Sequence, residues 1–348
     1  MTDLDQRIAS VLRERAEGEI DTHRLLHRSR ARGRRRQLRR RVATGTALAL
    51  VGVLGFVGVT GTDFVGLPGR PPWTAATPAA AAPVPPRADG VPGAAQRPDL
   101  VGADPQLLHL GVDPAKGRYL GWEVNETQVE SVRFDAGGGQ AVTVEVARSA
   151  TAFDGLGISG WLADSPPEPT FDGSIQRVVL SNGSPGYVTW WQPATGLYAR
   201  ASMRGEDPFA LTRAITAVRW DEARRCGGPV RLTHLPEGAS VRRCAVDVAT
   251  FPGAMTASFT IAGPRSAAMY VELRYGAQIA GGRTDGNLTI NGRPAHRYGD
   301  NLELLGISKA HLIVNFGWPG QGFTEADAAT VLVGARVAQD VSRPDTWG

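Results

Sequence analysis

The chain has 348 residues, enough for two domains, and carries a formal net charge of +4 with a pI near 9.4. The positive charge is concentrated: residues 1–62 hold 13 arginines against 6 acidic residues, whereas the remainder holds 25 basic against 28 acidic residues. A mildly acidic folded part argues against nucleic acid as its partner, and we expect none. Lysine is scarce while Ala, Gly and Arg are abundant, a composition that suggests a GC-rich bacterial genome.

Residues 1–41 are predicted to form a basic, amphipathic tail in the cytoplasm. Leu4, Ile8, Val11 and Leu12 recur at the spacing that places them on one face of a helix. Such a helix either docks on a cytoplasmic protein partner or lies on the membrane surface. The tail has no cysteine to complete a zinc site, and no metal or cofactor is predicted anywhere in the chain.

An arginine cluster, Arg28–Arg41, ends this tail. It has nine arginines in fourteen residues, and we expect it to keep this end of the chain in the cytoplasm. It should also bind anionic lipid headgroups. The arginines predicted to lie nearest the membrane are Arg34, Arg35, Arg36, Arg39, Arg40 and Arg41.

The uncharged stretch Val42–Thr62 follows directly and is predicted to be a transmembrane helix. Its 21 residues would span roughly 31 Å as a helix, enough for the hydrocarbon core. The alternative is a cleaved secretory signal, whose basic region is normally much shorter than 41 residues. The anchor predicts a single-pass protein of the cell membrane, with a cytoplasmic N-terminus and an extracytoplasmic C-terminus (type II topology).

Residues 63–103 are predicted to form a disordered, extended stalk. Pro68–Pro98 contains nine prolines among many alanines, and proline is incompatible with a helix interior or a central strand.

Residues 104–225 and 226–342 are predicted to be two copies of one unit. Val142–Ala150 aligns with Met269–Ala277, and the Asn-Gly of residues 182–183 aligns with that of residues 291–292. After each Asn-Gly turn we expect two strands and a helix. The predicted elements are Tyr187–Trp191, Leu197–Met203 and Pro208–Val218 in the first copy, and Ala295–Leu304, Ala310–Phe316 and Glu325–Val337 in the second.

Local signals support these helices and strands. Asp207-Pro208 is typical of a helix start, and Thr324 with Asp327 is typical of a capping box. Alternating valines at 142, 144 and 146 indicate a sheet buried on one face. The expected fold class is therefore α+β, in which each of two tandem repeats is an antiparallel sheet covered by its C-terminal helix.

The stretch Asn182–Val218, NGSPGYVTWWQPATGLYARASMRGEDPFALTRAITAV, carries a resemblance. It resembles small extracytoplasmic domains of actinobacterial single-pass membrane proteins, some of which are anti-sigma-factor-like regulators. This resemblance implies a sensing or interaction role without catalysis.

Four groups of residues are candidates for a bond or a site. Cys226 and Cys244 are predicted to form a disulfide in an oxidising compartment, the alternative being two unrelated buried thiols. The histidines at 109, 234, 296 and 311 are dispersed and are predicted to be structural, and Glu145 and Glu272 are predicted to face solvent on equivalent strands. An aromatic group either packs in the core or lines a groove for a glycan or peptide ligand; it consists of Tyr187, Trp190, Trp191 and Tyr198.

No catalytic constellation is found, so the protein is predicted not to be an enzyme. The expected function is that of a membrane protein with an extracytoplasmic sensor or interaction domain, signalling in an anti-sigma-like manner through its tail. The alternative is a structural cell-envelope protein or ligand carrier whose N-terminus serves only as an anchor. A hydrolase of the cell envelope is a third and less favoured hypothesis.

Overall fold

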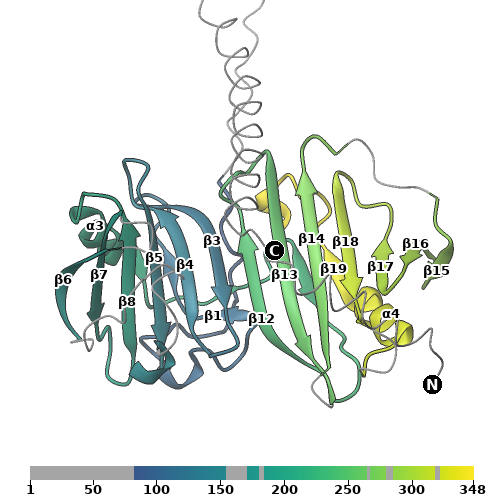
Figure 1. Cartoon of the computed structure of the whole chain (residues 1–348), viewed down its shortest axis with the longest axis horizontal. Coiled ribbons are helices and arrows are strands. Elements are labelled where there is room, and N and C mark those ends of the chain that lie inside the picture. Colours follow the sequence, from purple (N-terminus) through teal and green to yellow (C-terminus); the bar gives the residue numbers. More distant parts are fainter. Residues whose placement is uncertain (1–81, 154–170, 180–183, 265–266, 280–284, 318–321) are drawn as a thin grey trace, which may run out of the picture. The chain divides into compact units, whose positions relative to one another are not determined.

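The structure is a computed structural model that describes residues 82–153, 171–179, 184–264, 267–279, 285–317 and 322–348. Most of these residues belong to antiparallel strands, and the strands fall into two consecutive groups along the chain (Figure 1).

The first group of strands occupies residues 118–204. The strands pair in the order β3-β4-β5-β8-β7-β6. Strands β4 and β5 alternate buried and more exposed side chains, as in β4 with its buried Glu130, Val132 and Phe134. Their bounds are β3 (Arg118–Val124), β4 (Glu130–Asp135), β5 (Ala141–Ala147), β6 (Asp172–Val179), β7 (Pro185–Trp191) and β8 (Tyr198–Arg204).

The second group occupies residues 240–315 and pairs in the order β12-β13-β14-β18-β17-β16-β15. This order matches that of the first group except for one additional strand. The addition arises because the residues predicted as a single strand, 295–304, turn back on themselves at Gly299 and Asp300. The bounds are β12 (Ser240–Asp247), β13 (Ala254–Ala262), β14 (Ala268–Gly276), β15 (Leu288–Ile290), β16 (Arg293–Tyr298), β17 (Asn301–Leu304) and β18 (Ala310–Asn315).

The two groups form one sheet of 13 strands because β12 pairs with β3. Their antiparallel register runs from Cys244 opposite Val124 to Asp247 opposite Gly121. Figure 1 shows this pairing where the blue strands meet the green ones. The predicted α+β class, with a separate sheet in each repeat, is therefore wrong: the described part of the chain is mainly β and shares one antiparallel sheet.

Within the described residues, three two-stranded sheets and three short 3₁₀ turns accompany the large sheet. β1 pairs with β10, β2 with β9, and β11 with β19, all antiparallel. The bounds are β1 (Leu107–Leu108), β2 (Gly111–Val112), β9 (Val218–Arg219), β10 (Arg224–Arg225), β11 (Val230–Leu232), β19 (Ala335–Val337), η1 (Pro98–Leu100), η2 (Ala150–Phe153) and η5 (Pro344–Thr346).

The described residues contain two α-helices, α3 (Phe209–Ala217) and α4 (Glu325–Gly334). Each follows the last strand of its group and packs into the same hydrophobic core as the alternating valines of β5. Helix α4 begins at the predicted capping box: the Thr324 side chain accepts from the Asp327 amide, and the Asp327 carboxylate accepts from the Thr324 amide at 2.8 Å.

We expect Thr324→Ala to lower the free energy of unfolding by about 1 kcal/mol, because the helix then loses the side-chain acceptor at its N-terminus. Urea denaturation monitored by circular dichroism measures the change. Thr330→Ala, an exposed threonine of the same helix, is the matched control. Equal effects of the two substitutions would show that the cap contributes nothing.

The residues that the structure describes include no helix long and apolar enough to cross a membrane. Helices α3 and α4 have 9 and 10 residues, about half of the ~20 that a spanning helix needs. This finding does not support the prediction of a single-pass membrane protein with its N-terminus inside and its C-terminus outside. The tail 1–41, the predicted span Val42–Thr62 and residues 63–81 lie outside the described residues.

Residues 82–103, the second part of the predicted stalk, pack against the sheet structure. Ala94 and Val101 are fully buried in the core. The Ala88 amide donates to the carbonyl of Ala223, and the Ala95 amide donates to the carbonyl of Trp220. These contacts place this proline-rich segment beside β10 rather than leaving it as a free spacer.

The large sheet has one buried face and one face that is open over much of its width. On the buried face a cross-strand row of apolar side chains runs through both groups, and both helices pack on that side. The row is Ala295, Leu304, Leu312, Leu273, Ala257, Val246, Trp122, Val132, Val144 and Ala201. The neighbouring row lies on the opposite face and is mostly polar and half-exposed from β4 to β18: Ile313, Glu272, Ser258, Ala245, Glu123 and Ser131.

Candidate functional site

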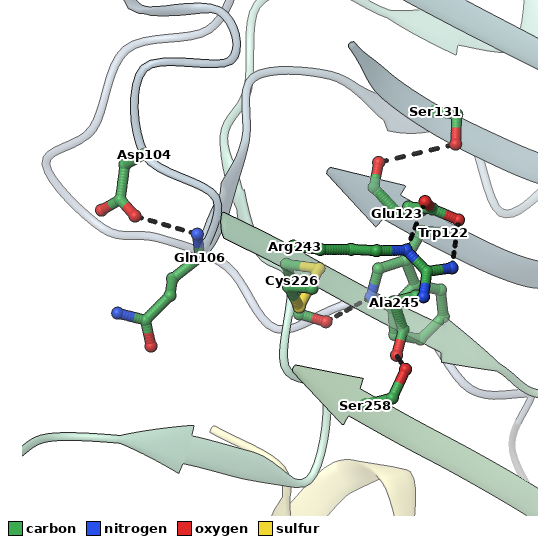
Figure 2. The surroundings of a disulfide bond; sticks show 10 residues. Asp104, Gln106, Trp122, Glu123, Ser131, Cys226, Arg243, Ala245 and Ser258 are labelled. Carbon is green, nitrogen blue, oxygen red and sulfur yellow. Dashed lines mark hydrogen bonds and ion pairs between the residues drawn. A yellow bond between two sulfur atoms is a disulfide. The ribbon is translucent and has the colours of Figure 1, made fainter. Parts of the chain in front are cut away.

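The junction between the two strand groups is held by a disulfide. Cys226, directly after β10, is bonded to Cys244 of β12 across a separation of 18 residues, and both side chains are fully buried. Figure 2 shows the indole N–H of Trp122 donating to the carbonyl of Cys226. The disulfide and this hydrogen bond together connect β3, β10 and β12 at Cys226. They fix the backbone on either side of that residue.

A groove of about 640 Å³ lies beside this fixed backbone. Its walls come from β10, β11 and β19, from the segment that leads into β1 and from residues 346–348. Three arginines line it: Arg225, Arg231 and Arg336. The acidic side chain on its wall, Asp104, accepts a hydrogen bond from the amide of Gln106 at 2.9 Å (Figure 2). We call this cavity the arginine groove.

The arrangement of two of these arginines is electrostatically costly. Arg231 and Arg336 stand directly opposite each other in the antiparallel β11–β19 pair, and both are exposed. Like charges in that position destabilise a strand pair. Within the described residues, neither of them, nor Arg225, has a carboxylate within ion-pair distance. The arginine groove therefore holds positive charge that its own walls do not neutralise.

The open sheet face at the junction differs in this respect. A cavity of about 390 Å³ lies there, and its charged side chains are already paired. Arg243 binds both carboxylate oxygens of Glu123 at 2.7 and 3.1 Å, and Arg133 reaches Asp247 at 2.8 Å. The hydrogen bonds to Glu123 raise the pKa of the Arg243 guanidinium. This cavity thus offers no uncompensated charge to an ionic ligand.

The structure does not bring the four aromatic residues of the predicted groove onto one surface. Tyr187 and Trp191 pack against the main core on the buried face of the sheet. Trp190 is buried in a small separate cluster with Val178 and Val188, and Tyr198 lies against Phe171 with ring centroids 4.9 Å apart. Alternation along β7 separates them, since adjacent residues point to opposite faces of a strand.

The predicted structural histidines and equivalent glutamates have specific partners. His109 lies against Glu130 and His311 against Glu303, at 2.7 and 2.6 Å. Both glutamates are buried. Glu145 forms a bidentate pair with Arg200 at 2.6 and 2.9 Å, so it is not a free carboxylate at the surface. Glu272, its predicted equivalent, is bonded to Arg274 at 2.6 Å.

Two sites predicted from the sequence lie outside the described residues, so the structure does not test them. The membrane-proximal arginines of residues 34–41, with their predicted lipid contacts, lie outside the described residues, as does the tail predicted to bind a cytoplasmic protein. Within the described residues, no group of three or more His, Cys, Asp or Glu side chains could hold a metal ion.

Sequence reasoning missed the arginine groove. Its two opposed arginines are more than a hundred residues apart in the chain, and a composition that is mildly acidic over the folded part conceals a local positive patch. A signal was present in the Val-Arg-Leu and Ala-Arg-Val runs of β11 and β19, where one arginine alternates with apolar residues. That pattern places each arginine on the solvent side of a half-buried strand.

Comparisons with known proteins add little. No model of a known protein family matches the chain, and no curated protein matches it either. Among solved structures, the chain is similar to the crystal structure of MucB in complex with MucA(peri), at 15% identity and a TM-score of 0.20, covering 66% of this chain and 90% of that chain. The predicted resemblance to actinobacterial membrane proteins has no further support in these comparisons. A likeness this weak carries no argument about function, which rests on the geometry of the arginine groove.

Proposed function

We propose that this protein is a non-enzymatic interaction protein that holds an acidic, extended segment of a partner protein in the arginine groove. The observation that carries the proposal is the unneutralised pair of Arg231 and Arg336, opposed across β11 and β19 at the wall of the groove. Arginine is suited to this role because its planar guanidinium binds a carboxylate through two hydrogen bonds.

The spacing of the pair indicates what the partner presents. Side chains directly opposite in an antiparallel pair have Cβ atoms about 4.5–5.5 Å apart. In an extended peptide, residues i and i+2 point to the same side and are separated by roughly 6.6 Å. Two acidic residues at i and i+2 can therefore each meet one arginine, and Arg225 is available to a third acidic group. The partner segment is an alternating acidic stretch.

The volume of the groove and its fixed walls suit such a ligand. A cavity of about 640 Å³ is within the roughly 300–1,000 Å³ of protein ligand sites. The Cys226–Cys244 disulfide holds one wall in place, and a preformed site loses less conformational freedom when it binds. The cost of two opposed arginines is then offset when the partner is bound.

We expect the labelled peptide SESESES to bind the protein and SQSQSQS to bind at least tenfold more weakly, as measured by fluorescence anisotropy. The charge reversal Arg231→Glu with Arg336→Glu should reduce the affinity for SESESES by more than tenfold. Raising the salt concentration should weaken binding to the unaltered protein, because exposed charges are screened.

The control is Arg118→Glu with Arg293→Glu, which makes the same change of charge at two exposed arginines that do not line the groove. This variant should bind SESESES within about twofold of the unaltered protein, because charges separated by more than a Debye length are largely screened. Equal losses in the two variants would show a response to net charge alone and would contradict the proposal. So would tighter binding of a single-stranded oligonucleotide of equal charge.

A further inference from the structure

Two exposed tyrosines flank two asparagines in one row across the open face of the sheet. The row consists of Tyr298 on β16, Asn301 on β17, Asn315 on β18 and Tyr270 on β14. Each residue is the direct cross-strand partner of the next, so all four side chains share one face. This row lies on the far side of the sheet from the core that contains α3 and α4.

The aromatic rings of this row are accessible. Tyr270 is 54% exposed and Tyr298 is 41% exposed, which is unusual in a sheet whose other large aromatic side chains are mostly buried. The Asn315 amide donates to the side-chain oxygen of Asn301 at 3.0 Å. The His296 ring lies beside the Tyr298 ring, with centroids 6.0 Å apart and planes inclined by 32°. The row therefore presents two exposed tyrosine rings, with the hydrogen-bonded side-chain amides of Asn301 and Asn315 between them.

A cavity of about 550 Å³ lies beside the row, with Tyr298 in its wall. The charged groups around it are already paired. Nδ1 of His311 is 2.6 Å from the buried carboxylate of Glu303, and Arg274 is bonded to Glu272 at 2.6 Å. That hydrogen bond raises the pKa of Arg274. Unlike the arginine groove, this site holds no surplus charge to attract an ion.

Nδ1 of His296, on the same wall, has no hydrogen-bond partner among the described residues. Within the described residues, the cavity walls hold no serine, threonine or cysteine beside the His311–Glu303 pair. Ring faces, amides and paired charges together favour a ligand that is neutral, rich in hydroxyl groups and apolar on its flat faces.

We propose that this face binds a neutral oligosaccharide laid across strands β16, β17, β18 and β14. Aromatic side chains offer an apolar face with a polar edge, which suits the C–H face of a pyranose ring. Adjacent strands lie about 4.8 Å apart, so three steps separate the backbones of Tyr298 and Tyr270 by roughly 14 Å. A trisaccharide can place its end sugars on the two rings and its middle sugar over the asparagine amides.

The test uses the full chain and three probes: maltotriose, cellotriose and N,N′,N″-triacetylchitotriose, each measured by isothermal titration calorimetry. At least one should bind saturably. Tyr270→Ala and Tyr298→Ala should each weaken that binding by about tenfold or more, since truncating a ring removes a stacking face. Tyr270→Phe and Tyr298→Phe should retain it to within about threefold, because the ring face remains.

Two controls separate this site from other surfaces. Phe209→Ala removes an exposed aromatic ring from α3 and should leave saccharide binding unchanged. The Arg231→Glu, Arg336→Glu variant should also leave it unchanged, because the arginine groove is a different surface. The proposal is overturned if none of the three saccharides binds, if the tyrosine-to-alanine variants bind as well as the unaltered protein, or if high salt abolishes binding.

Discussion

We expect Glu130→Ala to lower the free energy of unfolding by about 3–5 kcal/mol, the largest effect of any single substitution considered. The Glu130 carboxylate is fully buried on β4 and accepts three hydrogen bonds. These come from the amide of Gly102 and from the amide and ring Nδ1 of His109. Its loss leaves three buried groups without their partner, and each costs about 1–3 kcal/mol when it remains unsatisfied.

The same substitution tests how the N-terminal part of the described chain is held. The His109 carbonyl accepts from the Ala94 amide at 2.8 Å, so Glu130 anchors residues 94–109 through His109. Urea denaturation measures the free energy, and Glu126→Ala, at an exposed position, is the control and should change it by less than about 0.5 kcal/mol. A Glu130→Ala protein as stable as that control would contradict the anchoring role.

Loss of the disulfide should have the second largest effect. Cys226→Ala with Cys244→Ala should lower the free energy of unfolding by about 3 kcal/mol, since the bond closes a loop set by a separation of 18 residues. The unfolded chain regains the freedom that the bond removes, while the native packing around two buried alanines is largely kept.

The single variants give the sharper comparison. Either Cys226→Ala or Cys244→Ala alone breaks the bond, so each should cost nearly as much as the double substitution, a strong departure from additivity. Denaturation of all three variants under non-reducing conditions gives the values. A double-variant loss equal to the sum of two smaller single losses would show that the cysteines contribute as separate buried side chains.

Local features of the fold could be predicted from the sequence because their causes lie within a few residues. Thr324 and Asp327 form the expected capping box at the start of α4. Asn291 and Gly292 both adopt positive φ, at 46° and 76°, in the two-residue turn that joins β15 to β16. Asn-Gly is preferred in such turns because both residues tolerate this conformation.

Features that depend on distant residues could not be predicted in this way. The pairing of β12 with β3 joins residues about 120 positions apart, and the strands' own sequences do not specify which other strand lies beside them. The pattern of each half is equally consistent with two separate sheets, and that led to the wrong fold class. The hairpin at Gly299 was missed because Ala295–Leu304 was predicted as one strand, although Gly299-Asp300 is itself a turn signal within that run.

Both candidate sites also depend on the pairing of strands that are distant in the chain, so neither could be predicted from local sequence. The arginine groove brings together β10, β11 and β19, and the tyrosine row brings together four strands. What separates the two in chemistry is whether their charges are already paired. Arg231 and Arg336 face each other without a carboxylate among the described residues, whereas Arg274 and His311 have one each.

The most direct test of the central claim is to locate a bound acidic peptide by photo-crosslinking. SESESES with a benzophenone group at one end is irradiated with the full chain, and the modified residues are identified by mass spectrometry. Binding in the arginine groove predicts adducts in residues 225–233 and 336–338, and their loss in the Arg231→Glu, Arg336→Glu variant. Adducts confined to the open sheet face, or unchanged in that variant, would contradict it.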